Sequence, residues 1–430
     1  MVRDLSCYMA GITFFCFIAL LLVACDSELA VPPLVAVPST TSLSATSDVD
    51  VLTFWHALPA SEAQVLQNMV DEWGQKEQVR VELSSVKDEE TLHQFLLVAA
   101  LQGTAPTLAF ARPSDMAQYI KADALLPLDS LHEEQKWKDD DSHFFDVLDY
   151  AEDSRLYGWP IYRHQTLLFM NRSLVSQVGS VEPTSWDDLL NTCAAFLEKG
   201  GNNCLAMYPE RNAELLWLLS HSGHMVDETG KNVLFDDTLK EVLDWLAELR
   251  ALGGVYQAAS YESQWDAFIN GETLFTFDST EAIPDYEARM NSAFDLAIVP
   301  PPFSGEAPIT VATGGTVVAF RHDERENALA KEFMRQLTEE SVNSRWARAF
   351  GEYPAQYRAS AHVASNENEA SPIQQGTQSL SDAGSEPMLV VWPQIKQVLA
   401  QAMLNVINGS QTPEEAYQEA ILNAESYLSQ

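Results

Sequence analysis

The protein is a chain of 430 residues, of which 46% are hydrophobic, and its 62 acidic and 25 basic residues give a formal net charge of −37. A surface this acidic repels phosphate backbones and anionic headgroups, which excludes DNA or RNA binding. After the N-terminal leader and tether described next, about 380 residues remain. One hydrophobic core rarely serves so long a chain, so we expect two lobes or domains.

The chain opens with an apolar run, Tyr8–Ala24, that ends at Cys25. A run of about 17 residues is at the lower limit for a membrane-spanning helix. The segment Leu22–Cys25 resembles a bacterial lipobox, in which the chain is cut before the cysteine and the thiol is lipidated. We therefore expect residues 1–24 to be a lipoprotein signal peptide and Cys25 to carry the lipid. An uncleaved anchor helix is the alternative.

The segment after Cys25 and the remaining cysteines agree with a location outside the cytoplasmic membrane. Residues 25–48 are rich in Ser, Thr, Pro, Ala and Val and have no helix or strand period, which predicts a flexible tether. Beyond it only Cys193 and Cys204 are cysteines, and in an oxidising compartment an isolated pair favours a disulfide. Cys193 falls in a predicted helix and Cys204 follows the turn KGGNN. Two buried thiols are the alternative.

The body begins with alternating strands and amphipathic helices. Strands are predicted at residues 50–56, 79–86 and 107–111, with helices at 61–77 and 88–103 between them and Ser61 as the first N-cap. This order predicts a mainly parallel sheet wrapped by helices. Ligands settle at the carboxyl ends of such strands, which here means Trp55, His56 and Arg112.

The later part repeats this pattern. Residues 155–171 read as a strand pair broken by Pro160, and residues 308–320 as one broken by Gly314–Gly315. Helices are predicted at Trp186–Leu197, Asn212–Ser220, Asp237–Leu252, Trp265–Ile269 and Pro393–Leu428, the last restarting at Pro413 after the cap Thr412. Ser360–Pro387 reads as an irregular surface excursion.

Several segments, in this order and spacing, resemble the extracellular solute-binding proteins of family 1, the sugar-binding lipoproteins of ABC importers. The segments that carry the resemblance are LTFWHAL, ALQGTAPTLAFARPSDMAQYIKADALLPLD, LYGWPIYRHQTLLFMNRSLV, PTSWDDLL, WDAFINGETLFTFDST, GGTVVAFRHDERENALAKEFMRQLT and TPEEAYQEA. The chain departs from the family at Thr107, where an aspartate is common, and at Arg163–His164. These departures leave the identity of the ligand open.

The resemblance implies an α/β, periplasmic-binding-protein-like fold of type II, with two α/β lobes joined by a hinge of crossing strands. Lobe one would comprise residues 49–160 and 311–350, and lobe two residues 161–310 and 351–430, with Pro160, Gly314 and Gly351 as hinge candidates. It also implies a monomeric receptor, anchored to the cell membrane as a lipoprotein, that passes a carbohydrate to permease subunits without a cofactor.

Sugar recognition needs aromatic faces for the pyranose ring and planar polar groups for its hydroxyls. Glycines would let the backbone approach the ligand. The candidate ligand-binding residues are Trp55, His56, Arg112, Trp159, Tyr162, Arg163, His164, Trp217, Asp278, Gly314, Gly315, Tyr353 and Trp392. For each tryptophan, core packing is the alternative, and for each polar residue an ordinary surface role.

The sequence carries none of the common catalytic signatures, neither Gly-x-Ser-x-Gly nor His-Glu-x-x-His nor Cys-x-x-Cys, so we do not expect an enzyme. His221 and His224 have no evident third ligand, so we expect no metal site. Two alternatives stay open: a non-transport sensor of the same fold, and a secreted glycoside-acting enzyme. Arg112 and Arg163 also leave room for an anionic ligand, such as a sugar or polyol phosphate.

Overall fold

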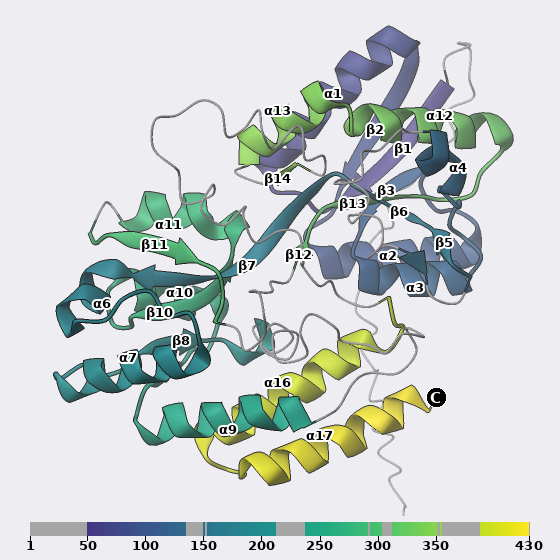
Figure 1. The fold of residues 1–430 in the computed structure, drawn as a ribbon. Helices are drawn as coiled ribbons and strands as arrows, with labels where there is room; N and C mark the ends of the chain where they lie inside the picture. Colours follow the sequence, from purple (N-terminus) through teal and green to yellow (C-terminus); the bar gives the residue numbers. More distant parts are fainter. Residues whose placement is uncertain are drawn as a thin grey trace, which may run out of the picture. The chain divides into compact units, whose positions relative to one another are not determined.

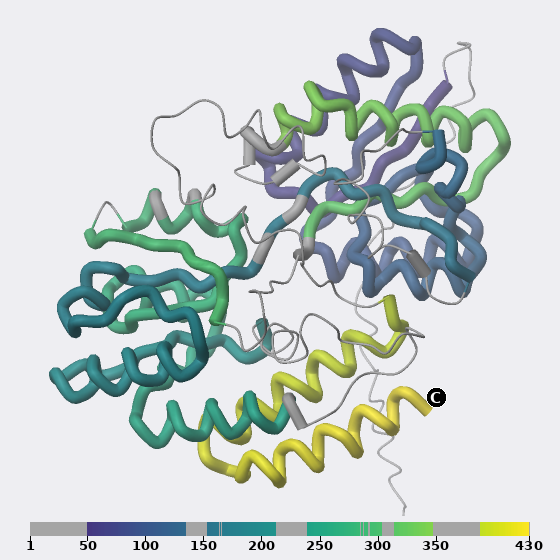
Figure 2. The backbone as a smooth tube through the Cα atoms, in the orientation of Figure 1, coloured from purple at the N-terminus to yellow at the C-terminus, as the bar shows by residue number. Residues whose placement is uncertain are grey.

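The computed structural model of the chain divides into two compact units, Met1–Ser44 and Ala45–Gln430. The structure describes residues 50–134, 149–150, 153–211, 237–290, 293–302, 312–350, 353–354 and 388–429, all within the second unit. Figures 1 and 2 trace these residues. The predicted leader, tether and lipid site lie outside the described residues. So do the helix expected at 212–220, His221 and His224, and the excursion at 360–387.

The first sheet has five strands in the order β2-β1-β3-β13-β6. Strand β1 pairs in parallel with both β2 and β3, whereas β13 is antiparallel to β3 and β6. The strands are β1 (Asp50–His56), β2 (Val79–Ser85), β3 (Leu108–Ala111), β6 (Gly158–Pro160) and β13 (Thr316–Ala319). The predicted parallel strands are confirmed, and the returning strand β13 makes the sheet mixed.

Helices on both sides of this sheet complete what we call lobe one (Figure 1). They are α1 (Ala60–Glu77), α2 (Glu89–Gln102), α3 (Pro113–Lys121), α4 (Asp129–Glu134), α12 (Glu324–Leu337) and α13 (Glu340–Phe350). A small hairpin of β4 (Asp149–Tyr150) and β5 (Arg155–Leu156) adjoins them in the chain. Helix α1 begins one residue earlier than predicted, with Pro59 as N-cap and no side-chain cap bond, so the prediction of Ser61 as N-cap was wrong.

The second sheet forms lobe two and has the strand order β11-β7-β10-β8-β9. Its strands are β7 (Tyr162–Asn171), β8 (Leu205–Met207), β9 (Val255–Gln257), β10 (Phe275–Ser279) and β11 (Leu296–Val299). Its helices are α6 (Arg172–Val178), α7 (Trp186–Glu198), α9 (Asp237–Ala251), α10 (Tyr261–Ile269), α11 (Ile283–Met290), α16 (Trp392–Asn408) and α17 (Pro413–Leu428), with a 3-10 turn η1 (Thr280–Ala282). Thr412 caps α17 in a capping box, as the sequence predicts.

Strand β7 shows why this sheet is covered on both faces. Leu168 and Met170 enter the core that includes α9, α16 and α17, whereas Leu167 and Phe169 enter a second core with α10 and α11. Alternate side chains of a strand point to opposite faces, so a run of apolar residues predicts two covered faces.

Short segments of chain connect the two sheets. Strand β7 follows β6 after Ile161, and its first residues pair with β14 (Tyr353–Pro354) and β12 (Ala312–Thr313). The break after Pro160 and the break at Gly314–Gly315 are therefore where the sequence predicts them, between β6 and β7 and between β12 and β13.

Cys193 of α7 and Cys204, just before β8, form a disulfide, and both are fully buried. The predicted pairing is thus present in the structure. No described helix has the length and apolarity needed to cross a membrane.

Candidate functional site

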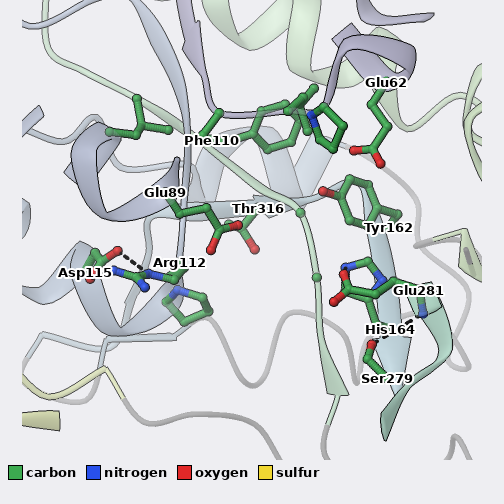
Figure 3. A pocket seen from close by; sticks show the side chains of 18 of the residues that line it. Glu62, Glu89, Phe110, Arg112, Asp115, Tyr162, His164, Ser279, Glu281 and Thr316 are labelled. Atoms are coloured by element: carbon green, nitrogen blue, oxygen red, sulfur yellow. Dashed lines mark hydrogen bonds and ion pairs between the residues drawn. The ribbon is translucent and has the colours of Figure 1, made fainter. Parts of the chain in front are cut away.

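A pocket with a volume of about 610 Å³ is lined by residues of both lobes (Figure 3). Lobe one contributes the turn after β1, the start of α2 and the segment from β3 into α3. Lobe two contributes the carboxyl end of β10, η1 and part of α10. Of the predicted ligand-binding residues, the pocket brings together Arg112, Tyr162, His164, Asp278, Gly314 and Gly315.

On the lobe-one wall, Arg112 is held by a buried carboxylate. Its Nε donates to Asp115 Oδ2 at 2.7 Å and its Nη2 to Asp115 Oδ1 at 3.2 Å, and Nη2 also reaches Glu90 Oε2 at 3.4 Å. Asp115 is only 3% exposed. The chain favours this pair locally, because Arg112 precedes α3 and Asp115 occupies its first turn, where a negative charge is stabilised. Figure 3 shows the pair on one side of the pocket.

On the lobe-two side of the pocket, four charged or titratable groups form a chain. His164 Nε2 lies 3.2 Å from Glu281 Oε2, and Arg211 Nη2 donates to Glu281 Oε1 at 3.0 Å. Arg211 Nη2 also lies 3.7 Å from Asp278 Oδ1. Burial lowers the pKa of His164, and attraction to Glu281 opposes this shift. Burial opposes ionisation of Glu281, but attraction to His164 and Arg211 outweighs it, so the pKa of Glu281 lies below its ordinary value.

Glu62, in the first turn of α1, is the exception to this pairing. It lines the pocket and has no ion-pair partner among the residues that the structure describes. Burial, together with repulsion from Glu281 and Glu89, raises its pKa to about 7. Glu62 is therefore partly protonated at neutral pH, and its carboxyl group can both donate and accept hydrogen bonds.

Tyr162 lies where the chain passes between the sheets. Its ring stacks on Trp346 of α13, with centroids 5.5 Å apart and an interplanar angle of 10°. A Cβ atom at Gly315 would lie 2.2 Å from Tyr162 Cε1. The space left by the missing side chain of Gly315 is thus filled by the Tyr162 ring, whereas the sequence suggested that this glycine admits the ligand.

Three predicted tryptophans lie elsewhere. Trp55 and Trp159 are in the lobe-one core and Trp392 is in the lobe-two core, each at most 1% exposed, and none is among the residues lining the pocket. Inside the lobe-one core, Trp159 Nε1 donates to Thr338 Oγ1 at 3.3 Å. Contrary to the expectation, these positions do not expose the tryptophans: helices cover both faces of the sheet that holds Trp55 and Trp159 (Figure 1), and Trp392 begins α16 and does not follow a strand.

The other predicted residues have different positions. His56 is 2% exposed and its Nδ1 accepts from the backbone N–H of Leu58 at 3.3 Å, so it shapes the turn that precedes the pocket residues of α1. Burial lowers the pKa of His56. Arg163 and Tyr353 are paired in the β7–β14 ladder, where the structure describes only their backbone. Trp217 lies outside the described residues.

Sequence reasoning missed the aromatic and charged groups nearest Asp278. Tyr261 and Trp265 line the pocket from α10, and Arg211 from the chain after β8, with its Cζ 3.9 Å above the Tyr261 ring. One signal could have found them: Asp278 is the one charged residue of the strand FTFDS, and a buried carboxylate there requires hydrogen-bond donors from neighbouring elements. Glu281, three residues later, lies in η1, which directly follows this strand.

The charges decide what the pocket can bind. Its lining includes six acidic residues, Glu62, Glu89, Asp115, Asp278, Glu281 and Asp285, but three Arg or Lys residues, Arg112, Arg211 and Lys396. Both arginines already contact carboxylates of their own lobe. An anionic ligand would therefore meet a net negative wall, whereas a hydroxyl-rich neutral ligand finds donors and acceptors. Among the described residues, no cluster of His, Cys, Asp and Glu is arranged to hold a metal ion.

Comparison with known proteins gives a family match and a fold. The model of the bacterial extracellular solute-binding protein family matches residues 68–373. Among curated proteins, none matches the sequence significantly.

Solved structures with the same fold cover most of the chain. The cyclic alpha-maltosyl-1,6-maltose binding protein from Arthrobacter globiformis is 18% identical, with 88% of this chain and 99% of that one covered and a TM-score of 0.76. The sugar-binding protein MalE from Xanthomonas citri is 19% identical, with 88% and 97% covered and a TM-score of 0.77. The GacH receptor of Streptomyces glaucescens, solved unliganded and with acarbose, is 19% identical, with 89% and 99% covered and a TM-score of 0.73. The predicted two-lobed, periplasmic-binding-protein-like fold is confirmed.

Proposed function

Because this chain belongs to the bacterial extracellular solute-binding protein family, we propose that it is the lipid-anchored receptor of an ABC importer and binds a neutral carbohydrate between its two lobes. Family membership makes it a solute receptor of a transport system and not an enzyme. The observation that carries the proposal is the pocket itself, whose two walls come from different sheets.

The walls suit a saccharide. Tyr162, Tyr261 and Trp265 supply aromatic surface, and the paired groups Arg112–Asp115 and Arg211–Glu281 supply planar donors and acceptors for hydroxyl groups. Because each arginine is held by a carboxylate, neither offers a full positive charge to a phosphate or uronate. The ligands of two similar proteins, a cyclic maltosyl-maltose and acarbose, are saccharides too, which supports the same class.

The anchor and the hinge complete the proposal. Cys25 would carry the lipid and residues 25–48 would tether the receptor near the permease. Lobe one would comprise 49–160 and 311–350, and the crossings near Ile161, Gly315 and Tyr353 would absorb the backbone change when the lobes close on the ligand.

A thermal-shift comparison tests the ligand class. Maltotriose, acarbose and a β-linked trisaccharide are compared with glucose 6-phosphate and galacturonate. We expect stabilisation by one or more of the oligosaccharides, because a ligand at a hundredfold its Kd adds about 2.7 kcal/mol to the free energy of unfolding. Stabilisation by the phosphate or the uronate alone would contradict the neutral-ligand proposal.

A further inference from the structure

Asp278 occupies an unusual place in lobe two. In β10, Phe275 and Phe277 point into the core that includes α9 and α16, so Asp278 points to the opposite face, toward α10 and α11. It is 1% exposed, although it belongs to the pocket lining. A carboxylate this deeply buried is stable only when donors surround it.

Four donors satisfy the two oxygens of Asp278. Oδ1 accepts from the Tyr261 hydroxyl at 2.7 Å and from the backbone N–H of Ser279 at 2.8 Å. Oδ2 accepts from Trp265 Nε1 at 2.7 Å and from the Tyr286 hydroxyl at 2.8 Å. A carboxylate offers about four lone-pair sites, so these contacts use its accepting capacity and leave little for a ligand hydroxyl.

Three of the four residues that donate to Asp278 line the pocket: Tyr261, Trp265 and Ser279. Tyr261 and Trp265 line the pocket and pack edge to face, with centroids 4.8 Å apart. Arg211 lies over the Tyr261 ring and 3.7 Å from Asp278 Oδ1, and it reaches Glu281 beyond. We call Arg211, Tyr261 and Trp265 the lobe-two wall. Each of its members contacts Asp278.

We propose that Asp278 is a positioning residue for carbohydrate binding: it fixes the orientation of the lobe-two wall and does not itself bind the ligand. This inference rests on the proposed function, because a positioned wall matters only for a ligand in the pocket. It replaces the sequence-based expectation that Asp278 contacts the ligand directly.

The fold of α10 has a separate support, which makes the inference testable. Gln264 is fully buried, its amide donates to the Phe277 carbonyl at 3.0 Å, and its Oε1 accepts from the Tyr208 N–H at 2.7 Å. These bonds tie α10 to the strands without Asp278. Loss of the Asp278 acceptors should therefore change the orientation of the Tyr261 and Trp265 side chains more than the position of α10.

Asp278→Asn changes the hydrogen-bonding pattern although the two side chains have nearly the same size. Each oxygen of Asp278 faces one group that can only donate, Ser279 N–H on one side and Trp265 Nε1–H on the other. Whichever way the amide turns, its NH2 group meets one of these donors. The variant must therefore break a contact of the wall or of the strand.

Thr276→Val is the matched control. Thr276 is fully buried on the same face of β10, and its hydroxyl donates to the Ala206 carbonyl at 3.1 Å and not to a residue of the lobe-two wall. The variant loses one buried hydrogen bond of the same strand, so it reports what a structural loss outside the lobe-two wall does.

The first readout needs no ligand. In ¹H–¹⁵N spectra, with the Trp265 indole signal assigned through Trp265→Phe, we expect the wild-type indole proton to be shifted downfield and protected from exchange. Asp278→Asn should move this signal, whereas Thr276→Val should leave it in place. An unchanged Trp265 signal in folded Asp278→Asn would overturn the inference.

The second readout is affinity for maltotriose and acarbose. Where the wild type binds either, folded Asp278→Asn should bind at least tenfold more weakly and Thr276→Val with unchanged affinity; equal binding by Asp278→Asn overturns the positioning role. A wild type that binds no carbohydrate counts against the proposed function, and the indole spectrum then decides the positioning of the wall on its own.

Discussion

A methyl group at Gly315 should displace Tyr162 from the pocket. The added Cβ would lie 2.2 Å from Cε1, 2.3 Å from Cζ and 2.7 Å from Oη of Tyr162, whereas carbon atoms pack at about 3.5–4.0 Å. The ring must therefore move by about 1 Å or more. The ring cannot move freely, because it is stacked on Trp346, which is 1% exposed.

The expected cost of Gly315→Ala is that of overpacking, about 1–3 kcal/mol of unfolding free energy. Gly315 does not have a left-handed backbone conformation, so the cost is steric and not one of backbone strain. Urea unfolding of the wild type and the variant measures it. Because Tyr162 lines the pocket, carbohydrate affinity should fall as well.

A double-mutant cycle with Tyr162→Ala identifies the cause. With the ring removed, the new methyl group has the space that the ring occupied, so Gly315→Ala should cost little in that background. An equal cost of Gly315→Ala with and without the Tyr162 ring would refute the steric reasoning.

Three further predictions concern charge, covalent structure and processing. Glu62 has a pKa of about 7 in the folded protein and about 4.5 when unfolded, so Glu62→Gln should leave stability unchanged below pH 4.5. Between pH 4.5 and 7 the variant should become increasingly more stable than the wild type, and above pH 7 the gain should be about 3 kcal/mol at most. Urea unfolding at pH 5 and pH 8 measures this gain, and a gain independent of pH would contradict the assignment. Replacing Cys193 and Cys204 together by alanine should cost about 3 kcal/mol, since the bridge spans a sequence separation of 11 residues, and equal denaturation midpoints for the wild type with and without reductant would argue against it. Cys25→Ala should abolish lipidation, and metabolic labelling with a radioactive fatty acid should show label only in the wild type; equal labelling of both would disprove the lipid site.

Local sequence signals predicted the architecture well where one physical rule dominated. Thr412 followed by Pro413 and Glu415 predicts a capped helix start, and the structure has a capping box there. Pro160 and Gly314–Gly315 predict breaks between strands, and the chain leaves one sheet for the other at those points. In these places no long-range packing competes with the local preference.

The pocket was less predictable, because strand ends are exposed or covered according to the whole fold. Trp55 is the last residue but one of β1 and is enclosed by lobe one, whereas Arg112 follows β3 and lines the pocket. Arg211 follows β8 and Tyr261 begins α10, and only the pairing of β8 with β10 and the packing of α10 on the sheet bring them to Asp278. Residue type and spacing do not contain that information.

Calorimetric titration of the wild type and two wall variants tests most directly whether a neutral carbohydrate binds between the lobes. The titrant is the neutral oligosaccharide that gives the largest thermal stabilisation, and the variants are Arg112→Ala in lobe one and Tyr261→Ala in lobe two. We predict one ligand per wild-type chain and at least a tenfold loss of affinity, about 1.4 kcal/mol, in each folded variant. The account is contradicted if no neutral oligosaccharide binds, or if both variants bind as tightly as the wild type.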